Sequence, residues 1–304
     1  MALRVWLAYA GMCLIWGTTW LAIKISLQGM GPLTGVGVRF VLAGIFLFVV
    51  AFARGEVRPL RSLPWKLIAL MALLMFSINY VLNYVAEMQL SSGLVAVLFG
   101  TLPFFTFGFS QAMLGERTTP RIWLGSLAAF AGVAVISLAS AEGSPLFALA
   151  AVGAAATAAL GNVVAKKYVH ESPLVTLPPA MALAGAGVLL FGLVFERTDW
   201  PHALSGSSLA ALLYLAVFGS GIAFFLMMWV LRRLSAGAVG LATLIFPVIA
   251  VAVGALFGGE HFTLRELLGS ALVVVGLSIA LTRSTARASQ QQNEPVQETA
   301  AAAS

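Results

Sequence analysis

Charged side chains are scarce in this chain. Asp, Glu, Lys and Arg make up 9% of its 304 residues, whereas they make up about 25% of an ordinary soluble domain. Hydrophobic residues account for 61%, so too few polar side chains remain to cover a surface in water. The composition therefore excludes a soluble globular domain and predicts a protein whose outer surface faces lipid.

Residues that bind metals or carry catalysis are also scarce. The single cysteine, Cys13, excludes an intrachain disulfide and a cysteine-built metal site. The three histidines, His170, His202 and His261, are too scattered to indicate a metal cluster. Neither a Gly-x-Ser-x-Gly turn nor a Gly-x-x-x-x-Gly-Lys-Ser/Thr phosphate loop occurs. We therefore expect no enzyme, no metal or other cofactor and no nucleic-acid partner.

Long apolar runs dominate what is present. A helix that crosses a membrane needs about 20 apolar residues at about 1.5 Å each. Ten segments meet this length: 5–26, 32–53, 64–84, 91–114, 121–139, 145–166, 173–195, 207–231, 236–257 and 265–283. The sequence thus predicts an all-α membrane protein with ten transmembrane helices.

The chain also contains an internal duplication. A shift of 144 positions carries residues 90–132 onto 234–276 without a gap, with 13 identities in 43 positions. Most identities are not the common apolar residues; they include Pro103 with Pro247, Glu116 with Glu260, and Arg121 with Arg265. Duplication at this length in an apolar chain favours a membrane transporter made of two structural repeats.

Positive charge indicates the orientation. With the N-terminus in the cytoplasm, 13 of the 17 Lys and Arg fall in inner segments, three fall outside, and Arg39 lies within a span. Because positive residues favour the cytoplasmic side, we expect both termini there. Five spans per repeat is an odd number, so the second repeat is inverted and Glu116 and Glu260 lie on opposite sides. Inverted repeats predict a central site near the membrane midplane.

Several short motifs resemble the EamA module of the drug/metabolite transporter superfamily. They are Trp16-Gly17-Thr18-Thr19-Trp20, Pro32, Arg39-Phe40, Pro103, Gly115-Glu116, Leu124-Gly125 and Gly132, with Pro247, Gly259-Glu260, Leu268-Gly269 and Gly276 in the second copy. The resemblance implies a first EamA repeat over 1–141, a second over 142–283, and a multi-pass location in a bacterial-type inner membrane. Residues 284–304 lack apolar periodicity and predict a disordered cytoplasmic tail.

Arg39 is the leading candidate for substrate binding, because a charge within a span is costly. Its planar guanidinium suits a carboxylate or phosphate, although it could instead hold helices together. Trp16, Trp20 and Lys24 are spaced i, i+4, i+8 and form one helical stripe. That stripe suits an amphipathic cargo, whereas Lys24 could also reach the headgroups.

The third span carries a polar face. Asn79 and Asn83 are four residues apart, as are Tyr80 and Tyr84, and lipid would penalise such groups. The spacing favours a cavity lining over interhelical hydrogen bonding. Glu87 follows on this face and is the candidate for proton coupling, although an ordinary solvated glutamate is the simpler interpretation.

The duplicated glycines, glutamates and prolines indicate packing and hinge positions. Gly115 and Gly259 can end helices, and Glu116 and Glu260 can favour the positive N-terminus of the next helix. Pro103 and Pro247 lie within spans and free one carbonyl each, which allows bending.

These patterns predict a secondary carrier that exports small amphipathic metabolites, such as amino acids, by alternating access around a midplane cavity. Multidrug efflux is the alternative within transport, and a membrane sensor without flux is the alternative outside it. The partners expected are a small-molecule substrate and the lipid bilayer, with the protein a monomer or a homodimer.

Overall fold

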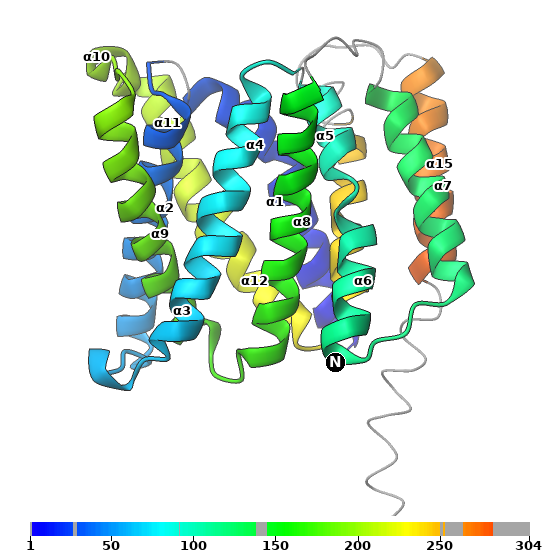
Figure 1. Ribbon diagram of the computed structural model, residues 1–304, viewed down its shortest axis with the longest axis horizontal. Coiled ribbons are helices and arrows are strands. Elements are labelled where there is room, and N and C mark those ends of the chain that lie inside the picture. The colour runs from blue at the N-terminus through cyan, green and yellow to red at the C-terminus, as the bar shows by residue number, and fades with distance from the viewer. Residues whose placement is uncertain are drawn as a thin grey trace, which may run out of the picture.

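The computed structural model describes residues 2–26, 29–90, 92–137, 145–249, 252 and 264–281. The described residues form helices and connecting turns, and no strand occurs among them. Figure 1 shows the long helices side by side, with the connections gathered at two ends.

The helices follow the apolar segments of the sequence closely. The first half contains α1 (Ala2–Ser26), α2 (Pro32–Ala53), α3 (Trp65–Met71), η2 (Ala72–Ile78), α4 (Asn79–Glu87), α5 (Ser92–Phe99), α6 (Leu102–Leu114) and α7 (Pro120–Ser137), with the short η1 (Leu60–Ser62) before α3. The second half contains α8 (Pro145–Tyr168), α9 (Pro173–Phe195), α10 (Trp200–Ala203), α11 (Gly206–Tyr214), η4 (Leu215–Ile222), α12 (Ala223–Leu231), α13 (Ala236–Gly240), η5 (Leu241–Leu244) and α15 (Leu264–Leu281).

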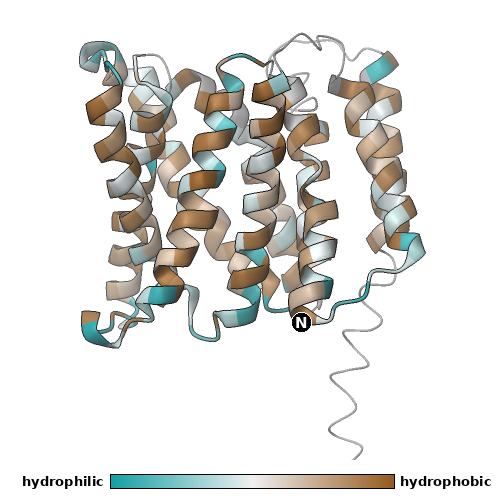
Figure 2. Ribbon diagram, viewed as in Figure 1, coloured by the Kyte–Doolittle hydropathy of each residue, from teal (hydrophilic) through white to brown (hydrophobic). Residues whose placement is uncertain are grey.

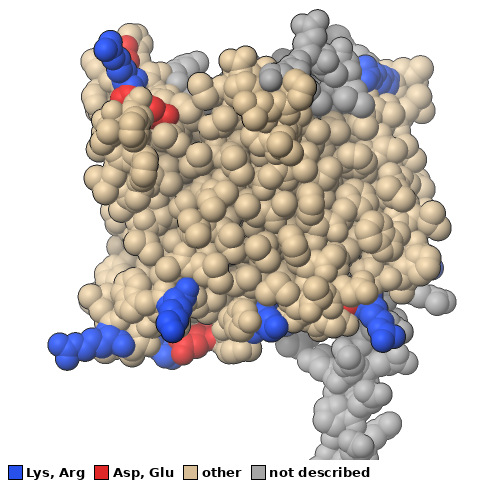
Figure 3. Space-filling view, in the orientation of Figure 1, with Lys and Arg blue, Asp and Glu red and all other residues tan. Residues whose placement is uncertain are grey.

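The flank of the bundle is apolar. Six described helices are long and apolar enough to cross a membrane, and three shorter apolar helices accompany them. Figure 2 shows hydrophobic residues along the helices, and Figure 3 shows Lys, Arg, Asp and Glu at the two ends of the molecule, with an uncharged band between them on the face in view. Such a band suits the hydrocarbon layer of a bilayer, so the chain is a multi-pass membrane protein.

Two helices contain a π-helical segment at equivalent places. The segment η2 interrupts the helix from Trp65 to Glu87, and η4 interrupts the helix from Gly206 to Leu231. The 144-residue shift carries η2 onto residues 216–222, which fall within η4. A π segment breaks the regular i to i−4 bonding of the backbone and often marks a functional place. The duplication in the sequence thus extends to local backbone geometry.

Glycines bring α2 and α9 into close contact, and the contacts are reciprocal. A Cβ on Gly37 would lie 2.5 Å from Cα of Leu189, and a Cβ on Gly185 would lie 2.5 Å from the backbone N of Val41. A shift of 148 carries Gly37 onto Gly185 and Val41 onto Leu189. Gly37 thus contacts the equivalent of Val41, and the equivalent of Gly37 contacts Val41 itself. Reciprocal contacts of this kind are the pattern of a two-fold interface.

The pair α7 and α15, which stand together at one edge of Figure 1, repeats this pattern. A Cβ on Gly125 would lie 2.5 Å from the carbonyl oxygen of Gly276, and one on Gly132 would lie 2.6 Å from that of Gly269. Here the shift of 144 carries Gly125 onto Gly269 and Gly132 onto Gly276. Small residues at both crossings allow the backbones to approach, as in membrane helix pairs generally.

Two duplicated arginines form hydrogen bonds between α7 and α15, one at each end of the helix pair. Nε of Arg121, in the first turn of α7, donates to the carbonyl oxygen of Ile279 at the end of α15, 3.0 Å away. Nε of Arg265, in the first turn of α15, donates to the carbonyl oxygen of Val135 near the end of α7. Each arginine therefore satisfies a free carbonyl at the C-terminus of the other helix.

Candidate functional site

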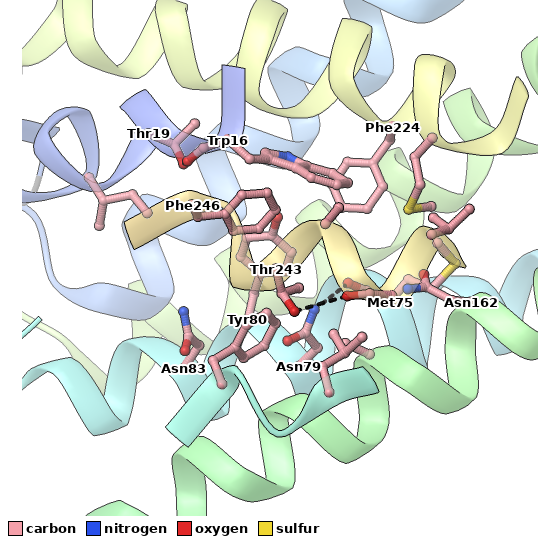
Figure 4. Close-up of a pocket in the computed structure, with 18 of the residues that line it drawn as sticks. Trp16, Thr19, Met75, Asn79, Tyr80, Asn83, Asn162, Phe224, Thr243 and Phe246 are labelled. Atoms are coloured by element: carbon pink, nitrogen blue, oxygen red, sulfur yellow. Dashed lines mark hydrogen bonds between the residues drawn. The ribbon is translucent and has the colours of Figure 1, made fainter. Parts of the chain in front are cut away.

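A cavity lies between the helices of the two halves. Its volume is about 100 Å³, counted as the space that water-sized molecules can occupy. That is room for several waters at roughly 10–15 Å³ each. Figure 4 shows the labelled side chains converging on this space from several helices. The lining residues are Trp16, Thr19, Ile23, Arg39, Met75, Asn79, Tyr80, Asn83, Phe99, Leu102, Ala158, Asn162, Phe224, Met227, Val239, Gly240, Ala242, Thr243 and Phe246.

The helix α4 supplies the polar wall. Asn79, Tyr80 and Asn83 all line the cavity, because residues three and four apart share one face of a helix. Asn79 and Asn83 are buried, with 7% and 9% of their surface exposed. The amide nitrogen of Asn79 donates to the carbonyl oxygen of Met75 at 3.2 Å, so this amide also satisfies a carbonyl of the π segment η2.

Arg39 reaches the cavity from α2 and is 1% exposed. Its Nε donates to Oγ of Ser220 at 2.8 Å, and its Nη2 donates to the carbonyl oxygen of Gly219 at 3.3 Å. The guanidinium carbon lies 5.0 Å from the centre of the Tyr80 ring, within range of a cation–π contact. Arg39 therefore holds the π segment η4 and also contributes to the cavity wall.

The carbonyl of Gly219 joins three helices. Besides Arg39 it accepts a hydrogen bond from Nε1 of Trp16, 3.0 Å away. A Cβ at Gly219 would lie 3.0 Å from the Cγ2 of Thr19 and 3.3 Å from Nη2 of Arg39. Glycine at this position thus lets α1 and α2 reach the carbonyl of η4.

Some buried polar atoms around the cavity have no hydrogen-bond partner among the described residues. They include Nη1 of Arg39 and Oδ1 of Asn83, both from lining residues, and Oε1 of Glu87. More than 90% of buried polar groups in proteins are hydrogen-bonded, so unpaired atoms beside a cavity indicate a place where water or a ligand binds.

The opposite wall is aromatic. The ring centre of Trp16 lies 5.2 Å from that of Phe224 and 5.7 Å from that of Phe246, in edge-to-face geometry. Such rings offer a large apolar surface at little conformational cost. Among the residues that the structure describes, the lining therefore combines one cation, three amides and an aromatic wall, which is an environment for an amphipathic molecule that carries a negative group.

The other predicted binding residues fall outside this lining. The side chains of Trp20 and Lys24 lie outside the described part of the structure, so their assignment stays a prediction. Tyr84 is 2% exposed and packs in the hydrophobic core instead of lining the cavity. Glu87, one turn beyond Asn83, ends α4 and is likewise absent from the lining.

Sequence reasoning missed several residues of the site. Asn162 in α8 and Thr243 in η5 both line the cavity, and Ser220 pairs with Arg39. Each is a polar residue in an apolar run, the same signal that pointed to Asn79 and Asn83. The aromatic and methionine residues, such as Phe224 and Met227, gave no such signal because apolar spans are full of them.

The first Gly-Glu corner connects the two halves of the chain. Gly115 ends α6 in the left-handed conformation, with φ 69°, which glycine adopts without strain. Glu116 then accepts from the backbone N of Ala236 at 3.0 Å and lies 3.1 Å from Nζ of Lys166. The expectation that this glutamate serves the next helix, α7, is wrong: it caps α13 of the other half. Gly259 and Glu260 lie outside the described residues.

The duplicated prolines sit beside breaks in their helices. Pro103 is buried in the first turn of α6, directly after the Gly100–Thr101 break that separates α5 from α6. Pro247 is buried just after the 3-10 segment η5. The chain therefore changes helical geometry at both prolines, and bending at these points stays a prediction.

A bundle of apolar helices around a buried, partly polar cavity is typical of membrane transporters. The model of the EamA-like transporter family matches the chain twice, at residues 4–138 and 146–282. The chain therefore belongs to the EamA-like transporter family, as the motifs around Trp16, Arg39 and Gly115 indicate.

Relatives share nearly the full length of the chain. It is 32% identical to the uncharacterized inner membrane transporter YedA of Escherichia coli K12, over 88% of this chain and 87% of that protein. It is 27% identical to a probable amino-acid metabolite efflux pump of Salmonella typhimurium, over 90% of this chain and 95% of that protein. A solved crystal structure resembles it with TM-score 0.80 at 22% identity, covering 93% of this chain and 98% of that chain, and supports the fold alone.

Proposed function

We propose that the protein is a secondary active carrier that exports small amphipathic metabolites bearing a carboxylate, with amino acids first among them. The observation that carries this proposal is Arg39: a buried cation on the cavity wall whose Nη1 has no partner among the described residues. A guanidinium binds carboxylates through charge-assisted hydrogen bonds. The Salmonella relative named as a probable amino-acid metabolite efflux pump supports the same cargo class and direction.

Alternating access follows from an inverted two-repeat architecture of ten transmembrane helices. Three features support it: the double match of the family model, the equivalent π segments η2 and η4, and the reciprocal glycine and arginine contacts between twin helices. A pseudo-two-fold axis makes the inward-open and outward-open forms nearly equivalent in energy.

The location proposed is a bacterial-type inner membrane with both termini in the cytoplasm. In Figure 1 the chain begins at the lower end of the bundle, which is also the end with more Lys and Arg in Figure 3. That distribution agrees with the excess of positive residues on cytoplasmic sides.

Multidrug efflux is the second candidate, and the described residues favour it less. Organic cations are usually recognised by a buried carboxylate, whereas no Asp or Glu is among the cavity-lining residues. We assign proton coupling to Glu87, whose Oε1 is buried without a partner among the described residues.

Counterflow tests the proposal. Purified protein in liposomes loaded with unlabelled carboxylates, zwitterionic amino acids or organic cations is given the labelled compound outside. We expect labelled amino acid to accumulate without ATP. Binding of ligands with no flux for any compound would instead establish a sensor, and flux confined to organic cations would establish multidrug efflux.

Labelling of introduced cysteines tests the inversion. Single cysteines at positions 116 and 260, in a chain whose Cys13 is replaced by Ala, should react with impermeant reagents from opposite sides of the membrane. Reaction of both from the same side would rule out the inverted repeat.

A further inference from the structure

Three buried polar atoms have no hydrogen-bond partner among the described residues. Nη1 of Arg39 and Oδ1 of Asn83 belong to residues that line the cavity, whereas Oε1 of Glu87 belongs to a residue outside the lining. Asn83 and Glu87 are four residues apart and share a face of α4. Arg39 comes from α2 but lies against the same helix, because its guanidinium carbon is 5.0 Å from the Tyr80 ring centre.

The three atoms differ in chemistry. Nη1 of a guanidinium can donate hydrogen bonds and never accept, whereas the carbonyl oxygen of an amide and the oxygen of a carboxylate accept. A ligand with a carboxylate alone would satisfy Arg39 and leave the oxygen of Asn83 unpaired. A ligand that satisfies both must carry a hydrogen-bond donor, an N–H or an O–H, beside its carboxylate.

An α-amino acid has this combination at a fixed distance. Its bonds of about 1.46 and 1.52 Å put the ammonium nitrogen about 2.5 Å from the carboxyl carbon. With hydrogen bonds of about 2.9 Å at each end, the protein donor and acceptor should lie about 6–8 Å apart. Arg39 and Asn83 line the same cavity, from α2 and α4 respectively, so a ligand in that cavity could meet both.

We infer that Asn83 is a specificity-determining residue that accepts a hydrogen bond from the ammonium group of an α-amino acid, while Nη1 of Arg39 binds the carboxylate. The apolar side chain of the amino acid then lies against the wall formed by Trp16, Phe224 and Phe246. This inference rests on the proposed function and narrows its cargo from carboxylates to zwitterions.

The experiment compares phenylalanine with 3-phenylpropanoate, which keeps the ring and the carboxylate and lacks the amine. In proteoliposomes that hold the wild-type protein, the counterflow rate of phenylalanine should exceed that of 3-phenylpropanoate at least about tenfold. A tenfold ratio corresponds to a free-energy difference of about 1.4 kcal/mol. In Asn83→Leu the phenylalanine rate should fall and the phenylpropanoate rate should stay, so that the ratio drops below about two. Asn83→Asp keeps an acceptor and should retain the preference.

Thr106→Val is the control, because it removes a buried polar group outside the cavity lining. The hydroxyl of Thr106 donates to the carbonyl oxygen of Leu102 within α6, so this variant should keep the wild-type ratio.

Three outcomes would overturn the ammonium site: equal wild-type rates for the two acids, an unchanged ratio in Asn83→Leu, or a ratio that collapses equally in Thr106→Val. A folded Asn83→Leu protein that loses both acids together would also overturn it. Failure of the wild-type protein to exchange any carboxylate would refute the proposed function itself, which is a separate result.

Discussion

The helices α4 and α12 occupy equivalent places in the two halves and present opposite chemistry to the cavity. The 144-residue shift carries α4, which spans Asn79–Glu87, onto Ala223–Leu231, the bounds of α12. Both helices follow a π segment and both line the cavity. Yet Tyr80 corresponds to Phe224, and Asn83 corresponds to Met227. The polar side chains of α4 are therefore replaced by apolar ones at the equivalent positions of α12.

The charged position shows the same asymmetry. Arg39 lies in α2, whereas α9, which packs against α2 through twin glycines, contains no charged residue. The backbone has therefore kept the duplication and the cavity side chains have lost it. Under the alternating access proposed above, symmetry of the backbone would give the two inverted forms similar energies, and asymmetry of the lining would serve recognition.

Among variants that test this asymmetry, Arg39→Gln should reduce transport the most. Loss of a charge-assisted hydrogen bond costs about 1.5–3 kcal/mol, so counterflow of carboxylate cargo should fall roughly 10- to 150-fold. Arg39→Lys should recover part of the activity, since a point charge lacks the planar fork.

The thermal unfolding midpoint serves as the control for Arg39, because Nε and Nη2 also hold Ser220 and Gly219. A Gln variant that fails to fold, with a Lys variant that behaves as wild type, would show that the arginine only joins helices.

Exchanging the twin residues should give the next largest effect. Asn83→Met should lower amino-acid counterflow about 3- to 10-fold, from the loss of one hydrogen bond of about 0.5–1.5 kcal/mol. Adding Met227→Asn should not restore the rate, because no charged residue in α9 accompanies the new amide. Full rescue in the double variant would mean that the two halves are interchangeable in recognition.

A smaller effect, on stability, is expected where the halves remain symmetric. In Gly132→Ala the new methyl group would lie 2.6 Å from the carbonyl oxygen of Gly269, and such overpacking costs about 1–3 kcal/mol. Gly269→Ala should behave alike. Gly108→Ala, where no atom lies within 4 Å of the new Cβ, is the control and should be neutral or slightly stabilising. Equal unfolding midpoints for all three would refute the close packing of α7 with α15.

The smallest effect should come from the ion pairs at the helix ends. Glu116→Ala removes the acceptor for the N-terminus of α13 and the partner of Lys166, and loss of a cap costs about 0.5–2 kcal/mol. Arg58→Ala breaks the exposed pair with Glu171, which is worth about 0–1 kcal/mol. Thermal unfolding in detergent should rank Glu116→Ala as the more destabilised, and the reverse order would contradict the cap.

The sequence predicted the helical membrane class and the family, because composition and duplicated motifs carry that information directly. Five of the residues that it singled out, Arg39, Trp16, Asn79, Tyr80 and Asn83, line the cavity, since polar groups in apolar spans are costly and therefore conspicuous. It also placed Tyr84 on the same face as Tyr80, whereas the structure puts Tyr84 in the hydrophobic core, because neighbouring helices pack over its side chain.

Other features depended on the packing of distant segments. The choice of α13 over α7 as the helix that Glu116 caps joins residues 120 positions apart, and no local pattern encodes such a pair. The sharing of the Gly219 carbonyl by Trp16 and Arg39 likewise requires the π segment, whose displaced backbone bonding is invisible in a run of apolar residues. The sequence by itself determined the solvent, the duplication and the rare polar side chains, because each is a property of residue type and spacing. The tertiary structure alone decided which of those side chains meet, because a contact between helices depends on crossing points and backbone distortions that arise only when the two halves pack.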